Sequence, residues 1–456
     1  MFGKNIVITI SGGFASRNIL RSGVLDNLLN AGSKIILFSP QEKADYYQKE
    51  FGNKNVLIIG LPPLKEGFVE AMIKFLARNS VRTEISLSLQ KEHLLSAVNP
   101  LNLISFLLKR LIGFLGFLPG FFEFVRFLDF YLVSEKTEIL RILKEVNPDI
   151  VFATHVIDEF DASILREAKR LCIKTIGMVR SWDNLTGHGL VRELPDKLLL
   201  HSPWLFRIAK NLHRIPEKKL EIIGIPQYDT FFRKDFLISR DKFLSIIGLR
   251  PDNRIVLFAA ISTDFAPYEW EIPEIIHNSI ENGSLPQNVV VIARPHPNCG
   301  VPQNFRQQGQ YLKIDTPAKY VGSSAYNWEQ EKDDINHFAN LLYHADVVVT
   351  GASTISMDAA IFDRPIINYA FDGYHKEVPY YQSVLRCYEK YTHYIAMVKT
   401  GGVRLVYSPE ELIEWIKKYL NNPELDHEGR QRIIKEFAGF TDGRSAERIS
   451  LAILGS

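Results

Sequence analysis

Residues 5–10 read Asn-Ile-Val-Ile-Thr-Ile, and Ser11-Gly12-Gly13 follows them directly. Apolar residues then recur at helical spacing from Ile19 to Leu29, and a second apolar run, Lys34–Ser39, comes next. An apolar strand, a glycine turn, an amphipathic helix and another strand predict a βαβ unit. Because such units place their strands parallel, this opening predicts an α/β fold with a parallel sheet.

The same alternation continues along the chain in two series. The first series of predicted strands lies at 5–10, 34–39, 56–60, 150–154, 175–179, 197–201 and 221–225, and the second at 254–260, 289–293, 311–314, 346–350 and 365–369. A chain of 456 residues exceeds the size at which a single hydrophobic core stops growing. We therefore predict two Rossmann-like domains that face each other across a cleft, at residues 1–232 and 233–430. We expect residues 431–456 to form closing helices, the last of which packs back on the first domain.

The composition is that of an ordinary globular protein, and the formal net charge of +2 offers no broad surface for a polyanion, so we expect no nucleic-acid partner. The three cysteines, Cys172, Cys299 and Cys387, lie far apart, without zinc or disulfide spacing, which is typical of a reducing compartment. The first predicted strand begins close to Met1 and leaves no room for a signal sequence. We therefore expect a cytoplasmic protein.

An insertion at residues 101–133 departs from the alternation. Its part Leu111–Phe122 contains only apolar residues, glycine and proline, and is flanked by Lys109, Arg110 and Arg126. The run is too short to span a bilayer. Two interpretations are open: a helix pair lying in the membrane interface, with its basic residues toward anionic headgroups, or a buried hairpin of core helices. The first predicts a peripheral protein at the inner face of the cell membrane.

Polar and reactive residues gather directly behind three predicted strands. These clusters are Ser181-Trp182-Asp183-Asn184 with Gly187-His188-Gly189, then Arg294-Pro295-His296-Pro297, and then Gly351-Ala352-Ser353-Thr354. In α/β proteins ligands bind at the carboxyl ends of the strands. The three clusters therefore predict one ligand site built from two halves.

The second half has the features of a phosphate site. Gly351, Ser353 and Thr354 open a predicted helix, where free backbone N–H groups and the positive dipole end favour an anion. Arg294 is suited to neutralise a leaving phosphate, and His296 to donate a hydrogen bond or a proton to it. We expect Asp358, one turn into the helix, to reach a sugar hydroxyl. The alternative is that these residues only cap and complement the helix end.

From about Ile173 to the C-terminus the chain resembles the CDP-glycerol glycerophosphotransferase-like family and related surface-polysaccharide glycosyltransferases of GT-B architecture. The segments that carry the resemblance are Trp182-Asp183-Asn184, Gly224-Ile225-Pro226-Gln227-Tyr228-Asp229, Arg294-Pro295-His296, Ser353-Thr354 with Asp358, and Asp442-Gly443-Arg444-Ser445-Ala446-Glu447-Arg448. The resemblance implies an acceptor-binding first domain and a second domain that binds a nucleotide-linked donor.

Two departures from the family pattern bear on the reaction. Asp183 stands where the family has a reactive histidine, and Gln227 stands where it has an arginine. A carboxylate base is typical of inverting glycosyltransferases, in which it removes the proton of the acceptor hydroxyl. Arg-Pro-His-Pro with the Ser-Thr pair is also similar to motifs of CMP-sugar-dependent transferases, so the donor stays open among CMP-, CDP- and UDP-linked species.

The acceptor side is expected around Asp183. Its predicted residues are Gly12, Gly13, Asp158, Glu159, Arg180, Trp182, Asn184 and His188. Asp158, Glu159 and Asp161, beside His155, are rivals of Asp183 as the base, or bind the acceptor, or begin a solvated helix. The sequence contains no Asp-x-Asp element that would chelate a divalent ion across a diphosphate, so we expect no metal and no cofactor.

These observations predict an inverting, metal-independent glycosyltransferase. It would move a sugar from a nucleotide-linked donor to a hydroxyl of a cell-surface glycan or of a lipid-linked acceptor. A CDP-glycerol-type polyol-phosphate transferase and a sugar-nucleotide 2-epimerase are alternatives that share the architecture. A non-catalytic protein that binds nucleotide sugars is a further one.

Overall fold

A computed structural model describes residues 3–97, 99–234, 236–303, 305, 309–316, 319–320 and 328–455. The chain divides into two compact units. The first unit runs from Met1 to Asp229 and takes in Gly439–Ser456, and the second lies between Thr230 and Ala438. The segment 431–456, predicted as one set of closing helices, is thus divided between the two units after Ala438.

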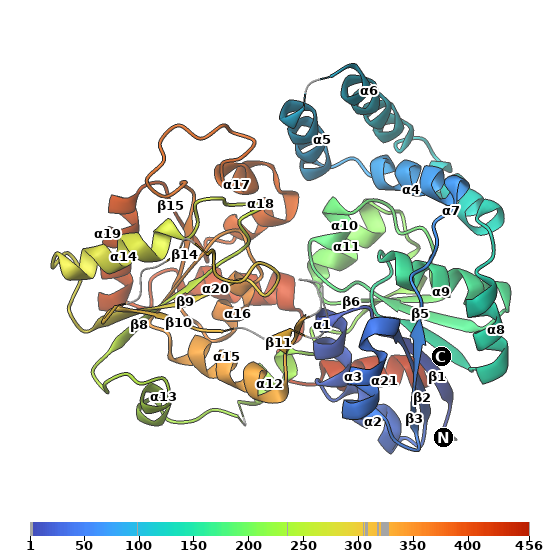
Figure 1. The fold of residues 1–456 in the computed structure, drawn as a ribbon, viewed down its shortest axis with the longest axis horizontal. Coiled ribbons are helices and arrows are strands. Elements are labelled where there is room, and N and C mark those ends of the chain that lie inside the picture. The colour runs from blue at the N-terminus through green and yellow to red at the C-terminus, as the bar shows by residue number, and fades with distance from the viewer. Residues whose placement is uncertain are drawn as a thin grey trace. The chain divides into compact units, whose positions relative to one another are not determined.

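The first unit contains a seven-stranded sheet in the order β3-β2-β1-β4-β5-β6-β7 (Figure 1), in which every pairing is parallel. Its strands are β1 (Asn5–Thr9), β2 (Lys34–Pro40), β3 (Val56–Leu61), β4 (Ile150–Ala153), β5 (Lys174–Met178), β6 (Lys197–Leu200) and β7 (Leu220–Ile222). Neighbouring residues of β1 face opposite cores, since Ile6 packs with Leu28 whereas Val7 packs with Leu143. The sheet is therefore covered on both faces, which explains its continuous apolar strands.

Helices form the two covering layers of this unit. They are α1 (Gly13–Ala15), the π-helix η1 (Ser16–Leu20), α2 (Val24–Asn30), α3 (Gln41–Phe51), α8 (Thr137–Val146), α9 (Glu159–Arg170), α10 (Asn184–Gly187), α11 (Pro203–Asn211), the 3-10 turn η2 (Glu217–Lys219) and α21 (Ser445–Leu454). The last of them, α21, packs against α2. Its Ile449 and Ile453 are fully buried in the same core as Leu25 and Leu28, so the end of the chain belongs to the first unit.

Two segments that carry the family resemblance form the joint that fixes α21. The carboxylate of Asp229 is buried and accepts the backbone N–H groups of Ser445 at 2.9 Å and Ala446 at 2.7 Å. Gly224 has a φ of 84° and approaches Ser445 so closely that a Cβ would lie 2.3 Å from its Oγ. A carboxylate at a helix N-terminus is stabilising, and these residues therefore have a structural role.

The second unit contains a parallel six-stranded sheet in the order β10-β9-β8-β13-β14-β15. Its strands are β8 (Arg254–Ala259), β9 (Val289–Arg294), β10 (Leu312–Ile314), β13 (Val347–Thr350), β14 (Ile366–Tyr369) and β15 (Arg404–Val406), and β11 (Lys319–Tyr320) pairs separately with β12 (Trp328–Glu329). The helices are α13 (Arg240–Ile246), α14 (Glu271–Glu281), α15 (Lys332–His344), α16 (Ile355–Ile361), α17 (Leu385–Lys390), α18 (Thr392–Val398), α19 (Pro409–Asn421), α20 (His427–Ile433) and the π-helix η3 (Ile434–Ala438). A short helix, α12 (Tyr228–Arg233), crosses the boundary between the units.

The predicted insertion is part of a larger helical excursion between β3 and α8. Its helices are α4 (Phe68–Ser80), α5 (Glu84–Ser96), α6 (Pro100–Leu115) and α7 (Phe121–Leu132). The interpretation of 101–133 as a buried hairpin of core helices is wrong for α6, because only Ile112 and Gly113 of that helix are buried. In the described part of the chain no helix combines the length and the apolar character needed to cross a bilayer.

Buried ion pairs fasten this excursion to the sheet-covering helix α9. Arg166 of α9 is fully buried and contacts Asp129 of α7 at 2.9 Å and Glu70 of α4 at 3.3 Å. Asp129 also pairs with Arg192 at 2.9 Å, and Arg192 with Glu159 at 2.6 Å. Because each buried charge has a partner of opposite sign, the network is internally compensated.

Candidate active site

The carboxyl ends of neighbouring strands bring the predicted acceptor residues of the first unit to one edge of its sheet. In this sheet β1 is followed by β2 on one side and by β4 on the other, so the order of the strands reverses between β1 and β4. Ligands of α/β proteins bind at this switch point. Gly12 and Gly13 follow β1, His155 follows β4, and Arg180 begins the loop after β5.

Asp183 lies in this group with two histidines. Its Oδ2 is 3.8 Å from Nε2 of His188, and its side chain is 33% exposed. His155 is buried, and the charges of Arg180, His188 and Asp183 all act on its ring. Burial first, and then Arg180 and His188, hold the pKa of His155 well below its usual range, so the imidazole is neutral near pH 7.

The glycine turn after β1 is linked to this group through an aromatic ring. The guanidinium carbon of Arg180 lies 5.3 Å from the centre of the Phe14 ring, and that of Arg17 lies at the same distance. Gly12 has extended backbone geometry, and a Cβ built there meets nothing within 4 Å. The space beside Gly12 where a side chain would lie is therefore open.

Other predicted acceptor residues serve the fold. Trp182 and Asn184 are buried, and Oδ1 of Asn184 accepts the N–H of Ser181 at 2.9 Å. Burial opposes the ionisation of Glu159, but its pairing with Arg192, together with the charges of Lys74 and Arg166, holds its pKa below the usual value. Asp158 accepts the N–H of Phe160 and so caps α9. Of the acidic residues after β4, Glu159 is thus engaged in the network and Asp158 in capping.

Asp161 is a buried carboxyl directly beneath this edge. It accepts a hydrogen bond from the Thr9 hydroxyl and another, at 3.3 Å, from the N–H of His155. Burial raises the pKa of Asp161 to about 8, and the neighbouring Asp158 adds to the effect. The carboxyl is therefore protonated near neutral pH and joins the ends of β1 and β4 without a charge.

The second unit places its predicted donor residues at an equivalent edge. Here the strand order reverses between β8 and β13, and the loops after β8, β9 and β13 carry Ile261, His296 and Gly351. A Cβ at Gly351 would lie 2.7 Å from Cδ1 of Ile261 and 2.9 Å from the Tyr369 hydroxyl. A larger residue at this position would therefore have to displace the side chains of Ile261 and Tyr369.

A buried polar network holds the Gly351 loop. Nδ2 of Asn368 donates to the carbonyl of Gly351 at 3.1 Å, and the Tyr394 hydroxyl donates to it at 3.2 Å. Tyr394 also contacts Oδ1 of Asn368 and the hydroxyl of Ser356, both at 2.8 Å. The turn that precedes α16 is therefore held rigidly.

The donor residues around that turn differ in exposure. Thr354 is exposed, Ser353 is half-buried and Asp358 is buried. The hydroxyl of Ser353 accepts the N–H of Ile355 at 3.3 Å, while the Thr354 side chain makes no capping hydrogen bond to α16. Ser353 thus acts locally as a helix cap, as the alternative interpretation allows.

Arg294 is engaged in a buried ion pair at the end of β9. Its guanidinium contacts Asp315, which directly follows β10, and it lies over the ring of Phe338 at 4.4 Å. His337 reaches the other oxygen of Asp315 at 2.7 Å. Burial opposes ionisation of Asp315, but His337 and Arg294 together hold its pKa below the usual range. Asp315 and His337 were missed in the sequence, although Asp315 stands directly behind a predicted strand.

His296 follows in the same loop. Its Nδ1 accepts the N–H of Asn298 at 3.2 Å, so in the neutral ring the proton resides on Nε2. Burial lowers the pKa of His296, with Asp264 acting in the opposite direction. A neutral imidazole with Nε2–H is a hydrogen-bond donor for a phosphate oxygen.

Glu269 was also missed, and no sequence signal marks it. It is buried beneath the loop after β8, where it accepts the N–H groups of Ile261 at 2.7 Å and Ser262 at 3.1 Å and the Tyr369 hydroxyl at 3.0 Å. Burial raises the pKa of Glu269 to about 7, although all three donors oppose the shift. Its position depends on packing between segments that are distant in sequence.

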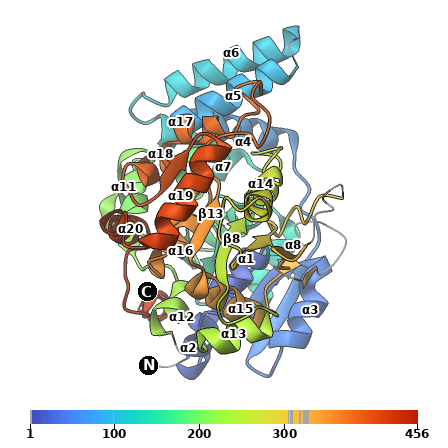
Figure 2. The same cartoon turned by 90° about the vertical axis from the view of Figure 1, so that its left-hand side faces the viewer.

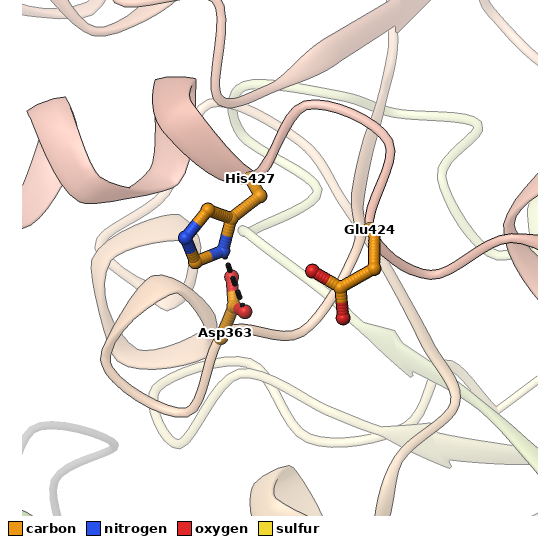
Figure 3. Close-up of side chains that lie close together, drawn as sticks. All are labelled: Asp363, Glu424 and His427. Atoms are coloured by element: carbon orange, nitrogen blue, oxygen red, sulfur yellow. Dashed lines mark hydrogen bonds and ion pairs between the residues drawn. The ribbon is translucent and has the colours of Figure 1, made fainter.

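Asp363, Glu424 and His427 have ligand-type atoms within 4.8 Å of one another, the spacing of a metal site (Figure 3). Nδ1 of His427 lies 2.8 Å from Oδ2 of Asp363, and Nε of the fully buried Arg430 donates to Oδ1 of Asp363 at 2.7 Å. The carboxylate of Asp363 thus has a cationic partner already, and Glu424 is exposed. This arrangement is explained as an anchor for α20.

Solved structures with the same succession of two parallel α/β sheets define the class of the fold. UDP-GlcNAc 2-epimerase from Neisseria meningitidis, solved with UDP-GlcNAc, is 11% identical, with 99% of this chain and 100% of that chain covered and a TM-score of 0.56. A glycosyltransferase from Rickettsia africae is 12% identical, with 99% of each chain covered and a TM-score of 0.51. The chain has the two-domain GT-B fold, as predicted.

The particular family follows from the sequence comparison. The model of the CDP-glycerol:poly(glycerophosphate) glycerophosphotransferase family matches residues 190–455, more than half of the chain, and the chain belongs to this family. The teichoic acid glycerol-phosphate primase of Bacillus subtilis strain 168 is 21% identical over 183 residues, which are 39% of this chain and 40% of that relative. The match thus spans less than half of the relative's length.

Proposed function

We propose that this chain transfers a group from a nucleotide-linked donor to an acceptor hydroxyl, with Asp183 as the base. The observation that carries the proposal is the position of Asp183, partly exposed at the carboxyl end of β5 and 3.8 Å from His188. A carboxylate there can accept the hydroxyl proton as the oxygen attacks. Arg180 and His188 would orient the acceptor or modulate the charge of Asp183.

On the donor side, the proposal assigns recognition of the phosphates to His296 and to the turn formed by Gly351, Ser353 and Thr354. His296 offers an Nε2–H, and the rigid turn offers backbone N–H groups. Preorganised hydrogen-bond donors of this kind stabilise the charge of a leaving nucleotide, each by about 3 kcal/mol in a water-poor site. Because Arg294 is paired with Asp315, we assign it to positioning the His296 loop.

The form of transfer we propose first is inverting, metal-independent sugar transfer to a cell-envelope glycan or a lipid-linked acceptor, at the inner face of the cell membrane. Asp183 in place of the family histidine favours it. The anomeric C–O bond breaks, the acceptor oxygen bonds to that carbon, and the nucleotide leaves. Transfer of a polyol phosphate from a CDP-linked donor is the second candidate, which membership of the glycerophosphotransferase family favours.

The released nucleotide and the phosphorus content of the product separate these forms. Incubation with CDP- and UDP-linked sugars and with a CDP-linked polyol, each with a lipid-linked acceptor, is followed by chromatography of nucleotides and mass spectrometry of products. Sugar transfer from these donors releases the nucleoside diphosphate and adds no phosphorus to the acceptor. Polyol-phosphate transfer releases CMP and adds a phosphodiester. Epimerised donor without any transferred group would overturn both forms in favour of the 2-epimerase alternative.

A further inference from the structure

Helix α6 exposes apolar side chains where a surface helix normally exposes polar ones. The exposed side chains are Leu101, Leu103, Ile104, Leu107, Leu108, Leu111 and Phe114. At about 100° per residue these positions occupy one half of the helix circumference. The buried Ile112 and Gly113 lie on the other half, and α6 is the outermost helix of the excursion in both views (Figures 1 and 2). This is the reverse of ordinary amphipathic burial.

The apolar surface continues beyond α6. Phe117 and Leu118, in the turn to α7, are 60% and 52% exposed, and Phe127 and Tyr131 of α7 are also exposed. We refer to the exposed side chains of α6 together with Phe117 as the α6 face. Clustered apolar exposure of this kind marks an interaction surface or a membrane surface.

Cations border the α6 face. Arg82 lies over the rings of Phe114 at 4.3 Å and Phe117 at 5.8 Å. Burial and the charge of Arg78 lower the pKa of Lys109, and burial and Arg82 lower that of Arg110, with Glu84 opposing. Helix α6 itself contains no Asp or Glu. Arg82 and Arg110 thus bring two cations to one edge of the apolar surface, whereas Lys109 lies on the half of α6 that carries the buried Ile112 and Gly113.

An apolar face bordered by cations narrows the range of partners that could cover it. A second copy docked through the same face would supply an apolar layer, but its α6 contains no Asp or Glu to pair with the cations at the edge. A transmembrane arrangement is excluded for α6, which has 16 residues and is bordered by charged side chains. An anionic lipid surface supplies both an apolar layer and negative headgroups, which complement the face and its edge.

We propose that the α6 face docks into the boundary between the headgroups and the acyl chains of a bilayer that contains anionic lipid, with α6 lying in the plane of the interface. This inference rests on the proposed function, which places the protein at the membrane, and it identifies the surface that would bind there. Docking requires neither donor nor Asp183, so it is tested apart from transfer.

The buried ion pairs between α4, α7 and α9 connect the docking helices to the predicted acceptor residues. Glu70 of α4 and Asp129 of α7 are bound to Arg166 of α9, and Asp158 caps the start of α9 and lies 3.9 Å from His155. Because these pairs are buried, the docking helices and the acceptor residues form one body within the first unit. Docking would therefore fix the orientation of the acceptor residues relative to the lipid surface.

Sedimentation with vesicles tests the proposal on the full chain. The vesicles are phosphatidylcholine alone, or phosphatidylcholine with about one third phosphatidylglycerol. We expect binding to the anionic vesicles that weakens with added salt, and about tenfold weaker binding for Leu111→Glu. Leu451→Glu is the matched control, since Leu111 is 56% and Leu451 55% exposed, and we expect it to bind like the wild type. Equal binding of the two variants, or no binding of the wild type, would overturn the proposal.

Two further measurements complete the test. Arg82→Gln combined with Arg110→Gln should remove most of the preference for anionic over neutral vesicles while retaining part of the binding, and an unchanged preference contradicts the assigned role of the cations. Analytical ultracentrifugation without lipid should give the same mass for the wild type and Leu111→Glu. A dimer that Leu111→Glu dissociates, together with absent vesicle binding, would assign the face to a second copy instead. Circular dichroism melts within about 2 °C of the wild type establish that each variant is folded.

Discussion

The two units present their functional residues at the same topological position but hold them differently. At the strand ends of the first unit, Asp183 and His188 are partly exposed and 3.8 Å apart. At those of the second unit, Arg294 is buried in an ion pair with Asp315, and Glu269 is buried under three hydrogen-bond donors. Acid–base chemistry needs a group that exchanges protons, whereas phosphate recognition needs a rigid frame. The difference indicates a division of labour between the units.

The largest expected effect concerns the rigid frame. Arg294→Met removes the buried guanidinium that pairs with the largely buried Asp315, and removing one member of a buried pair costs about 3 kcal/mol or more. We expect a loss of that size in the free energy of unfolding of the second unit, measured by urea denaturation. Arg250→Met removes an exposed pair with Asp252 and should change stability by less than about 0.5 kcal/mol. Equal losses in the two variants would break the comparison.

The next effect concerns the acid–base side. Asp183→Asn keeps the shape of the side chain but removes the proton acceptor, and we expect kcat to fall at least about a hundredfold. The affinity for the nucleotide-linked donor, measured by calorimetry, should change by less than about twofold, because the donor residues lie in the second unit. Asp45→Asn, at an exposed carboxylate of α3, serves as control and should retain full turnover. Normal turnover of Asp183→Asn refutes Asp183 as the base.

One glycine in each unit sharpens the same contrast. Gly351→Ala forces a Cβ against Ile261 and Tyr369, and overpacking of this kind costs about 1–3 kcal/mol of stability. Gly12→Ala meets no atom within 4 Å and should leave stability within about 0.5 kcal/mol of the wild type. If Gly12 lines the acceptor site, Gly12→Ala should raise the KM for the acceptor without lowering stability. A thermal melt and acceptor saturation curves check both expectations, and equal melting points would remove the contrast.

Local pattern predicted the sheets well because their strands are short, apolar and buried on both faces. The run at 289–293 predicted β9, and the run at 346–350 predicted β13. Among the three-residue strands, β7 and β10 were predicted at 221–225 and 311–314, whereas β15 (Arg404–Val406) was not predicted, because it contributes only two apolar residues after a charged one.

Which strand-end residues face solvent and which are locked in pairs was beyond the reach of the sequence. The partner of Arg294 is set by β10 pairing beside β9, which brings Asp315 to it across 21 residues. Likewise, the exposed side of α6 depends on which half of the helix packs on α4 and α5. Both are long-range outcomes, so the residue types were visible in the sequence whereas their environments were not.

The smallest expected effect is a difference in pH dependence between two buried carboxyls. Burial raises the pKa of Asp161 to about 8 in the first unit and that of Glu269 to about 7 in the second. An acid whose pKa is higher in the folded than in the unfolded state keeps its proton when folded. Its contribution to stability therefore falls as pH rises from the unfolded pKa, near 4, through the folded one.

Asparagine and glutamine do not titrate in this range, so each substitution should remove its part of that fall. Relative to the wild type, Asp161→Asn should gain stability between pH 5 and 8, by on the order of 1 kcal/mol, whereas the gain of Glu269→Gln should level off near pH 7. Urea midpoints at several pH values for both variants and the wild type measure these profiles. Parallel profiles for Asp161→Asn and the wild type would mean that Asp161 is ionised in the folded protein. The conclusion that a neutral carboxyl connects the ends of β1 and β4 would then be wrong.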